Sequence, residues 1–337
     1  MSHLDDYDDA IVSKELESLP KERGFARYGT EGKDGRLNLR LTYSGDETLT
    51  DYSHMRTWIG HQLLAGGYDA YDAEGAYPLC FNPKGKVTLE DVMAVMRNRF
   101  EGTEYSPDGT GRTDMRVIGT DAALSVHVAQ VHPELPADRS CVTWESTGPC
   151  VYGVFVPLSN AATSVNESYG RSQPAKDKGA FDAQAYPYYA FKELTTLCVE
   201  PDSYKVYGKP VRAYWHRVEK QLVKDMSTVL DETRTLDEAE AAKRLTDYCN
   251  HVQDQAFEDA KSLLNDVRWY KSQNSNTLKR GRNPETGEVL DELKEVKPLE
   301  VTLDASGYVL WSGGALGAQP RDRGRGGADR PSNKRAA

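Results

Sequence analysis

The sequence lacks several features that would assign a function at once. Its five cysteines form no C-x-x-C pair, so the pattern of a zinc site or a thioredoxin-type centre is missing. No apolar run approaches the roughly 18 residues that a membrane-spanning helix needs. The first ten residues, MSHLDDYDDA, are acidic and lack the basic-then-apolar plan of a signal peptide. We therefore expect a cytoplasmic protein with reduced thiols and no membrane partner.

The charge balance argues against a nucleic-acid-binding protein. Asp and Glu number 52 against 42 Lys and Arg, a formal net charge of −10. So acidic a chain repels phosphate backbones, and we expect no nucleic-acid partner. The acidic residues near the N-terminus lack the glycine turn and terminal glutamate of a calcium loop. We predict no metal and no cofactor.

Apolar residues at helical spacing predict helices over 51–65 and from Thr88 to Phe100. Thr88 with Asp91 has the spacing of a capping box. Strand patterns follow at 124–129, 141–145 and 150–158. The third is almost continuously apolar, which is typical of a strand buried on both faces.

The longest apolar stripes lie nearer the C-terminus. They predict two helices, 211–232 and 236–270, that form an antiparallel hairpin, with Thr235 and Glu238 as a second capping box. VTLDASGYVLW, residues 301–311, predicts two short strands about a turn. Residues 317–337 are rich in Gly, Pro and Arg, and we expect them to be disordered.

A thiol enzyme within this chain is a weaker alternative. Cys141 and Cys150 lie near His127 and His132 in sequence, and a Cys–His pair can form an activated thiolate. The two histidines differ by five in a strand-like pattern, so they should point to opposite faces. We therefore expect core cysteines and hydrogen-bonded strand histidines.

The stretch RNRFEGTEYSPDG, residues 97–109, places an acid, a glycine and a threonine between a helix and a sharp turn. Physical chemistry predicts a helix end with Gly102 near the left-handed conformation. The longer stretch EDVMAVMRNRFEGTEYSPDG also resembles a signature of the dipeptidase A family of cysteine peptidases. That family belongs to the N-terminal-nucleophile hydrolases.

Other blocks are similar to this family in the same order. They are YSHMRTWIG (52–60), MRVIGT (115–120), SVHVAQVHPELP (125–136) and CVTWESTGPCVYGVFVPL (141–158). The resemblance covers most of residues 1–275. It puts four side chains at motif positions near the site, and we predict that they lie close together: Arg116, His127, Gln130 and Trp144. His132 stands where the family often has arginine.

The resemblance implies an α+β fold, the αββα sandwich of N-terminal-nucleophile hydrolases. It implies a peptidase for small peptide substrates, with a homo-oligomer as a possible assembly. In such enzymes the leading cysteine is the nucleophile and its own amine is the base.

No cysteine precedes Cys80 here. We therefore expect residues 1–316 to be the C-terminal part of such a domain, incomplete at its N-terminal side, with no catalytic residue of its own. The alternative is an inactive remnant or binding module of the same fold.

Overall fold

The computed structural model divides the chain into two compact units, Met1–Val87 and Thr88–Ala337. The structure describes residues 11–29, 35–43, 51–73, 77–78, 80–112, 114–171, 182–274, 301–303 and 309–311. The expected tail, 317–337, and the turn at 304–308 lie outside these residues.

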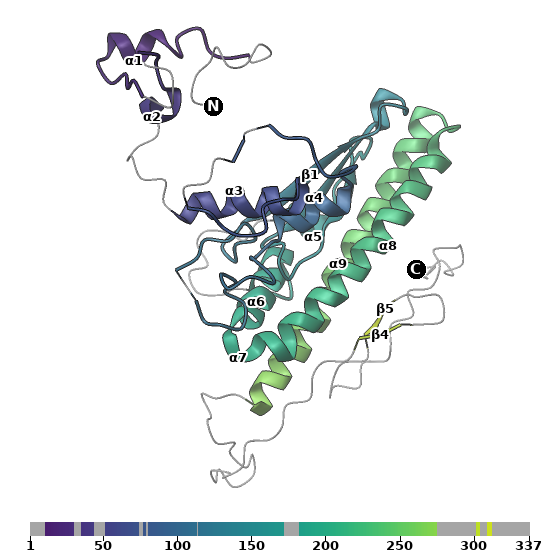
Figure 1. The fold of residues 1–337 in the computed structure, drawn as a ribbon. Coiled ribbons are helices and arrows are strands. Elements are labelled where there is room, and N and C mark those ends of the chain that lie inside the picture. The colour runs from purple at the N-terminus through teal and green to yellow at the C-terminus, as the bar shows by residue number, and fades with distance from the viewer. Residues whose placement is uncertain are drawn as a thin grey trace, which may run out of the picture. The chain divides into compact units, whose positions relative to one another are not determined.

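The described part of the first unit contains the helices α1 (Ser18–Glu22), α2 (Leu39–Tyr43) and α3 (Asp51–Leu64), which are labelled in Figure 1. The helix predicted at 51–65 is thus confirmed. It buries Met55, Trp58 and Ile59 at the one-turn spacing of a single helix face.

The second unit begins with α4 (Leu89–Met96), where Thr88 and Asp91 form the predicted capping box. The predicted extension of this helix to Phe100 is wrong, because the helix ends at Met96. Phe100 is fully buried but has a φ of +57°, so it fills the core from a loop. Helical spacing of apolar residues alone did not reveal this change of backbone conformation.

A three-stranded antiparallel sheet follows: β1 (Ser125–Val131), β2 (Cys141–Thr147) and β3 (Val156–Ser159). The third strand is shorter than predicted, because residues 150–155 form a turn and loop. That segment is nonetheless buried throughout, so its apolar character reflects depth in the core and not a strand.

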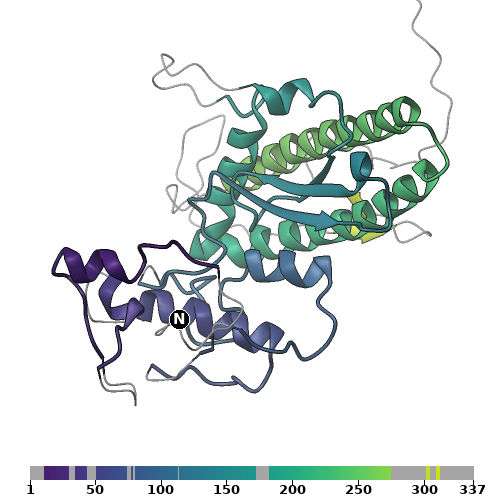
Figure 2. The same ribbon diagram turned by 90° about the horizontal axis from the view of Figure 1, so that it is seen from above.

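Helices then cover one face of the sheet (Figure 2). In chain order, the helices after β3 are α5 (Glu167–Gly170), α6 (Pro187–Val199), α7 (Pro201–Ser203), a π-helix (Tyr204–Gly208), α8 (Lys209–Thr233) and α9 (Glu238–Asn274). Of these, α6, α8 and α9 make the main contacts with the strands. A pair of short strands, β4 (Val301–Leu303) and β5 (Val309–Trp311), confirms the strands predicted in 301–311.

Helices α8 and α9 confirm the predicted hairpin and pack through their apolar stripes. The predicted cap at Thr235 is wrong, because Asp237 Oδ1 accepts the N–H of Glu240 at 2.8 Å. At the end of α8, Arg139 Nη1 donates to the carbonyl oxygen of Thr233 at 2.8 Å. This bond satisfies a carbonyl group that a helix end leaves without an intrahelical partner.

Candidate functional site

The family-like segment after α4, residues 97–119, is called the signature loop below. A buried ion pair anchors it: Arg97 Nη1 and Nη2 lie 2.7 and 2.5 Å from the carboxylate oxygens of Glu219 in α8. Glu219 also accepts the Phe155 N–H at 2.8 Å. Burial alone would lower the pKa of Arg97, but the Glu219 carboxylate outweighs it and the pKa is raised. Each charge therefore depends on the other.

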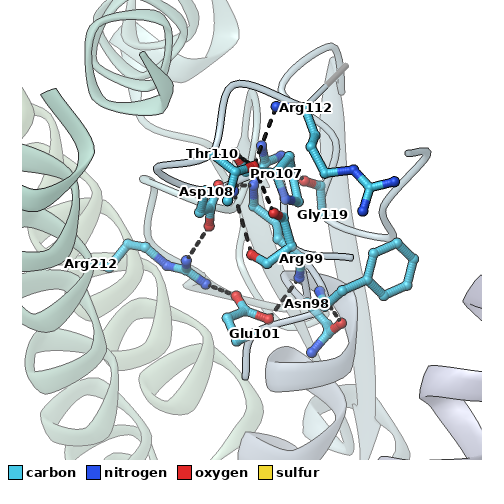
Figure 3. Close-up of polar contacts among 11 residues, drawn as sticks. Asn98, Arg99, Glu101, Pro107, Asp108, Thr110, Arg112, Gly119 and Arg212 are labelled. Carbon is cyan, nitrogen blue, oxygen red and sulfur yellow. Dashed lines mark hydrogen bonds and ion pairs between the residues drawn. The ribbon is translucent and has the colours of Figure 1, made fainter. Parts of the chain in front are cut away.

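Four residues form a closed ring of contacts within the loop and across to α8 (Figure 3). Arg99 Nε donates to Asp108 Oδ1 at 2.7 Å, and Arg212 Nη1 donates to Asp108 Oδ2 at 3.0 Å. Arg212 also pairs with Glu101, whose other oxygen accepts the Arg99 N–H at 2.8 Å. Two cations thus alternate with two anions, an arrangement that limits the cost of burying each charge.

The ring surrounds an unusual backbone. Phe100 is the only residue other than glycine with positive φ in the described part of the chain, and Gly102 has a φ of +80°. The predicted left-handed Gly102 in a turn is confirmed. The Phe100 N–H is satisfied by Asn98 Oδ1 at 2.9 Å. A residue other than glycine is strained at positive φ and keeps this conformation only when its surroundings hold it there. The ring of charged side chains holds Phe100 in this way.

A close backbone approach fixes the far end of the loop. A Cβ on Gly119 would lie 2.5 Å from the Arg97 carbonyl oxygen, so only glycine fits there. Arg99 Nη1 also donates to the Gly119 carbonyl oxygen at 2.7 Å. Both ends of the signature loop are therefore held together.

The Pro-Asp-Gly turn of the loop packs against the π-helix. A Cβ on Gly109 would lie 3.0 Å from Cδ1 of Tyr204. Burial raises the pKa of Tyr204, and Lys209 Nζ lies 5.7 Å from the centre of its ring. A π-helical turn is rare and often marks a functional site, so the loop, the π-helix and Arg212 together form the candidate site.

The strand residues at motif positions divide between two faces of the sheet. Trp144 Nε1 donates to Gln130 Oε1 at 3.0 Å, so the structure brings these two together on the covered face. His127 lies on the opposite, exposed face of β1, across from Glu145 in β2. Burial raises the pKa of Glu145, and the nearby His127 partly offsets this.

Arg116 has an exposed side chain in the signature loop, ahead of β1. The proximity of all four motif residues stays a prediction, as does any role for them. His132 follows β1, and its Nδ1 lies 3.2 Å from Glu134 Oε1.

Three of the five cysteines are buried in the core. Cys150, Cys198 and Cys249 are buried, and Cys150 Sγ donates to the Met96 carbonyl oxygen at 3.5 Å. Burial raises the pKa of Cys150 to about 11. A thiol of this pKa stays protonated at neutral pH and is a poor nucleophile. Cys141 is half-buried at the start of β2.

The described residues offer neither a cluster of metal ligands nor a membrane-spanning helix. No three His, Cys, Asp or Glu residues there gather in a way that suits a metal ion. No helix in the same part of the chain is both long enough and apolar enough to span a membrane.

Comparison with known proteins matches residues 2–217 to the model of Peptidase family C69. The matched relatives include a probable dipeptidase B of Lactococcus lactis, 26% identical over 249 residues, which are 69% of this chain and 50% of the relative. Dipeptidase A of Lactobacillus helveticus is 20% identical over 273 residues, covering 77% and 53%. A probable dipeptidase of Salmonella dublin is 24% identical over 185 residues, covering 53% and 40%.

The matched region contains the signature loop, the sheet and the start of α8. The chain belongs to Peptidase family C69, a family of cysteine peptidases, which confirms the resemblance seen in the sequence. The matched part of the chain spans 40% to 53% of the length of these three relatives.

Sequence reasoning missed the partners of the loop on α8. Glu219 stands within the apolar stripe of that helix, one turn after Trp215 and next to Val218. An acid on a buried face signals a buried cation elsewhere, since an unpaired charge there is costly. The sequence therefore indicates that Glu219 has a buried cationic partner, but it does not indicate which residue that partner is. Arg212 gave no such signal, because its partners lie more than 100 residues away in sequence.

Proposed function

We propose that this chain is part of a peptidase that hydrolyses peptide bonds in short peptides, in the manner of a dipeptidase. The nucleophile would be a cysteine at the N-terminus of the mature enzyme, outside these 337 residues, with its own amine as the base. The observation that carries the proposal is the family match over residues 2–217, together with the signature loop that lies inside it. The relatives are named as dipeptidases, which supports short peptides as the class of substrate.

We further propose the αββα fold of N-terminal-nucleophile hydrolases for the complete domain. In that fold a second sheet covers the face that the helices leave open. The alternating exposure along β1 supports this, because Ser125, His127, Ala129 and Val131 are all exposed. An exposed sheet face bearing apolar residues such as Val131 suits burial against another layer.

The four motif residues are proposed to act near the site without performing the bond cleavage. Trp144 and Gln130 hold the covered side of the sheet by their hydrogen bond. His127 projects from the exposed side, and Arg116 from the loop before it. Neither can replace a thiolate, so residues 1–337 alone should not hydrolyse dipeptides.

The test compares two purified proteins against a panel of dipeptides. One is the chain of 337 residues, and the other is extended upstream so that an in-frame cysteine is its first residue. Turnover by the extended protein alone, lost on changing that cysteine to alanine, supports the proposal. Turnover by the short chain overturns it, and loss of that turnover in Cys150→Ser or Cys141→Ser would reveal a thiol centre within the chain. Failure of both folded proteins favours the inactive remnant or binding module.

A further inference from the structure

One face of α8 carries a run of positive charge. Lys209, Arg217, Lys220 and Lys224 are exposed, and at about 3.6 residues per turn they lie within roughly a quarter of the helix circumference. Lys205 is exposed one turn earlier, in the π-helix. These five residues form the basic stripe. It is about 25 Å long, since a helix rises about 1.5 Å per residue.

No acid of the described residues balances the basic stripe. The one Asp or Glu between Lys205 and Lys224 in the sequence is Glu219, which is buried and pairs with Arg97. Among the residues that the structure describes, no Asp or Glu forms an ion pair with any of the five cations. The stripe therefore presents charge of a single sign to the surroundings.

Helix α9 shows the ordinary arrangement of exposed charges. Lys243 pairs with Asp247 and Lys261 pairs with Glu258, each at 2.5 Å, so opposite charges stand three or four positions apart. Such pairs stabilise a helix, whereas like charges at the same spacing destabilise it. Within the basic stripe, cations recur at four-residue spacing, so the stripe lowers the stability of its own helix.

The start of α8 is also an unfavourable place for a cation. The N-terminus of a helix carries partial positive charge and prefers acids. Lys209 is the first residue of α8, and the first turn contains no Asp or Glu. Its Nζ lies 5.7 Å from the centre of the Tyr204 ring, a contact that holds the ammonium group at the surface. Helix stability therefore does not account for the basic stripe, which suits a function outside the fold.

We propose that the basic stripe is a docking surface for an acidic segment of a partner protein, an extended stretch rich in Asp and Glu. An extended chain advances about 3.3 Å per residue, so roughly eight residues match the length of the stripe. Carboxylates along such a segment pair with the cations one after another, and their charge relieves the repulsion within α8. Complementary charge of this kind speeds association and selects the partner.

The shape of the basic stripe favours a peptide over other anionic partners. A membrane is a plane, and surface-bound helices also insert apolar side chains into it. The stripe is one helix face wide, and no exposed large apolar side chain lies between Lys205 and Lys224. A nucleic acid extends beyond the stripe, where a chain with a net charge of −10 repels its phosphate groups. A short acidic segment contacts the cations alone.

The test measures the fluorescence anisotropy of labelled peptides mixed with the full chain of 337 residues. A glutamate decapeptide is the probe, and a glutamine decapeptide is its neutral control. We expect only the glutamate peptide to bind, and its Kd to rise at least about tenfold between roughly 50 and roughly 300 mM NaCl, because salt screens exposed charges. Binding of neither peptide, or equal binding of both, overturns the proposal.

Two pairs of charge reversals locate the docking surface. Lys220→Glu with Lys224→Glu changes the basic stripe, whereas Lys243→Glu with Arg244→Glu makes the same change of net charge at exposed positions of α9. We expect the stripe variant to weaken binding of the glutamate peptide at least about tenfold, and the α9 variant to weaken it less than about twofold. Equal losses would show that net charge alone matters, and would contradict a docking surface.

Two further measurements test the role of the basic stripe and the class of its partner. Lys220→Glu places an acid between Arg217 and Lys224, so we expect its thermal midpoint to equal or exceed that of the wild type. A lower midpoint would mean that the stripe stabilises α8, contrary to a docking role. Vesicles of phosphatidylglycerol and phosphatidylcholine, and a thymidine decanucleotide, present the other anions. Tighter binding of either than of the glutamate peptide overturns the assignment to an acidic segment.

Discussion

The α8–α9 hairpin and the signature loop are both well packed, yet different kinds of information in the sequence specify them. The hairpin follows from a repeated local pattern, since apolar residues recur along each helix at 3.6-residue spacing. The loop follows from single polar residues whose partners are far away, such as Arg97 with Glu219. Many small contacts hold the first region, whereas a few charged contacts hold the second.

This difference predicts how the stability of each region should respond to substitutions. An apolar stripe loses stability in proportion to the damage at one position, and its neighbours still pack. A buried ion pair is worth little against an apolar replacement of both partners, but loss of one partner leaves an unpaired charge. Substitutions can therefore separate the two regions.

The largest effect is expected in the hairpin. Leu245 and Leu263 are 0% and 1% exposed, so Leu245→Asp or Leu263→Asp buries a charge without a partner. We expect a loss of several kcal/mol in the free energy of unfolding, about 4 kcal/mol or more, measured by urea titration. His251→Asp, at an exposed position of the same helix, is the control and should change stability little. Equal behaviour of the three variants would mean that the stripe is not core.

Loss of one partner from the loop anchor comes next. Glu219→Leu leaves the Arg97 guanidinium and the Phe155 N–H without their acceptor, and should cost about 3–5 kcal/mol in urea unfolding. The double variant Arg97→Met with Glu219→Leu should be more stable than Glu219→Leu alone. Additive losses in the double variant would show that the two charges do not depend on each other.

A smaller effect is expected at Gly102. Its φ of +80° is unfavourable for a β-branched residue, and a Cβ there would meet nothing within 4 Å. The cost of Gly102→Val is thus backbone strain alone, at least about 1 kcal/mol. For a unit of this size that is roughly 2–4 °C in the thermal midpoint. Gly102→Asn is the matched variant and should cost less, since asparagine tolerates this conformation. If the two cost the same, strain is not the cause.

The same contrast explains how much could be predicted from the sequence. The hairpin, the sheet strands β1 and β2 and the Thr88–Asp91 cap were all readable, because each depends on residues a few positions apart. Within the site, the turn at Gly102 was readable for the same reason. The left-handed Phe100 and the role of Arg212 were not, because tertiary contacts outweigh local preference there.

Helix ends depend on both local sequence and distant contacts. Both Thr235 and Asp237 are good N-cap residues, and the choice between them depends on the exact end of α8. That end is fixed by Arg139, which binds the carbonyl oxygens of Thr233 and Leu236 from nearly 100 residues earlier. A local pattern therefore narrows a helix start to a few residues, and a distant contact selects one.

The smallest effect concerns how often each region opens. Cys150 lies beside the loop anchor and Cys249 lies in α9, and burial raises the pKa of each thiol to about 11. Because only the thiolate reacts, both should be protected from a thiol reagent at pH 8 until their surroundings open. Equal pKa values make the two labelling rates comparable. With the other three cysteines changed to serine, we expect Cys150 to be labelled several times faster than Cys249, as few contacts hold the loop.

High salt should increase the difference in labelling rate between Cys150 and Cys249. The Arg212–Glu101 pair at the rim of the ring is partly exposed, with side chains 18% and 33% accessible, so high salt should weaken it. We expect 1 M NaCl to speed the labelling of Cys150 modestly and to leave Cys249 unchanged. In Arg212→Met the salt effect on Cys150 should disappear, whereas Arg217→Met, at an exposed position of the same helix, should retain it. Equal labelling of both thiols at low and high salt would show that the loop opens no more often than the hairpin, so that a few buried charges fix it as firmly as a long apolar stripe.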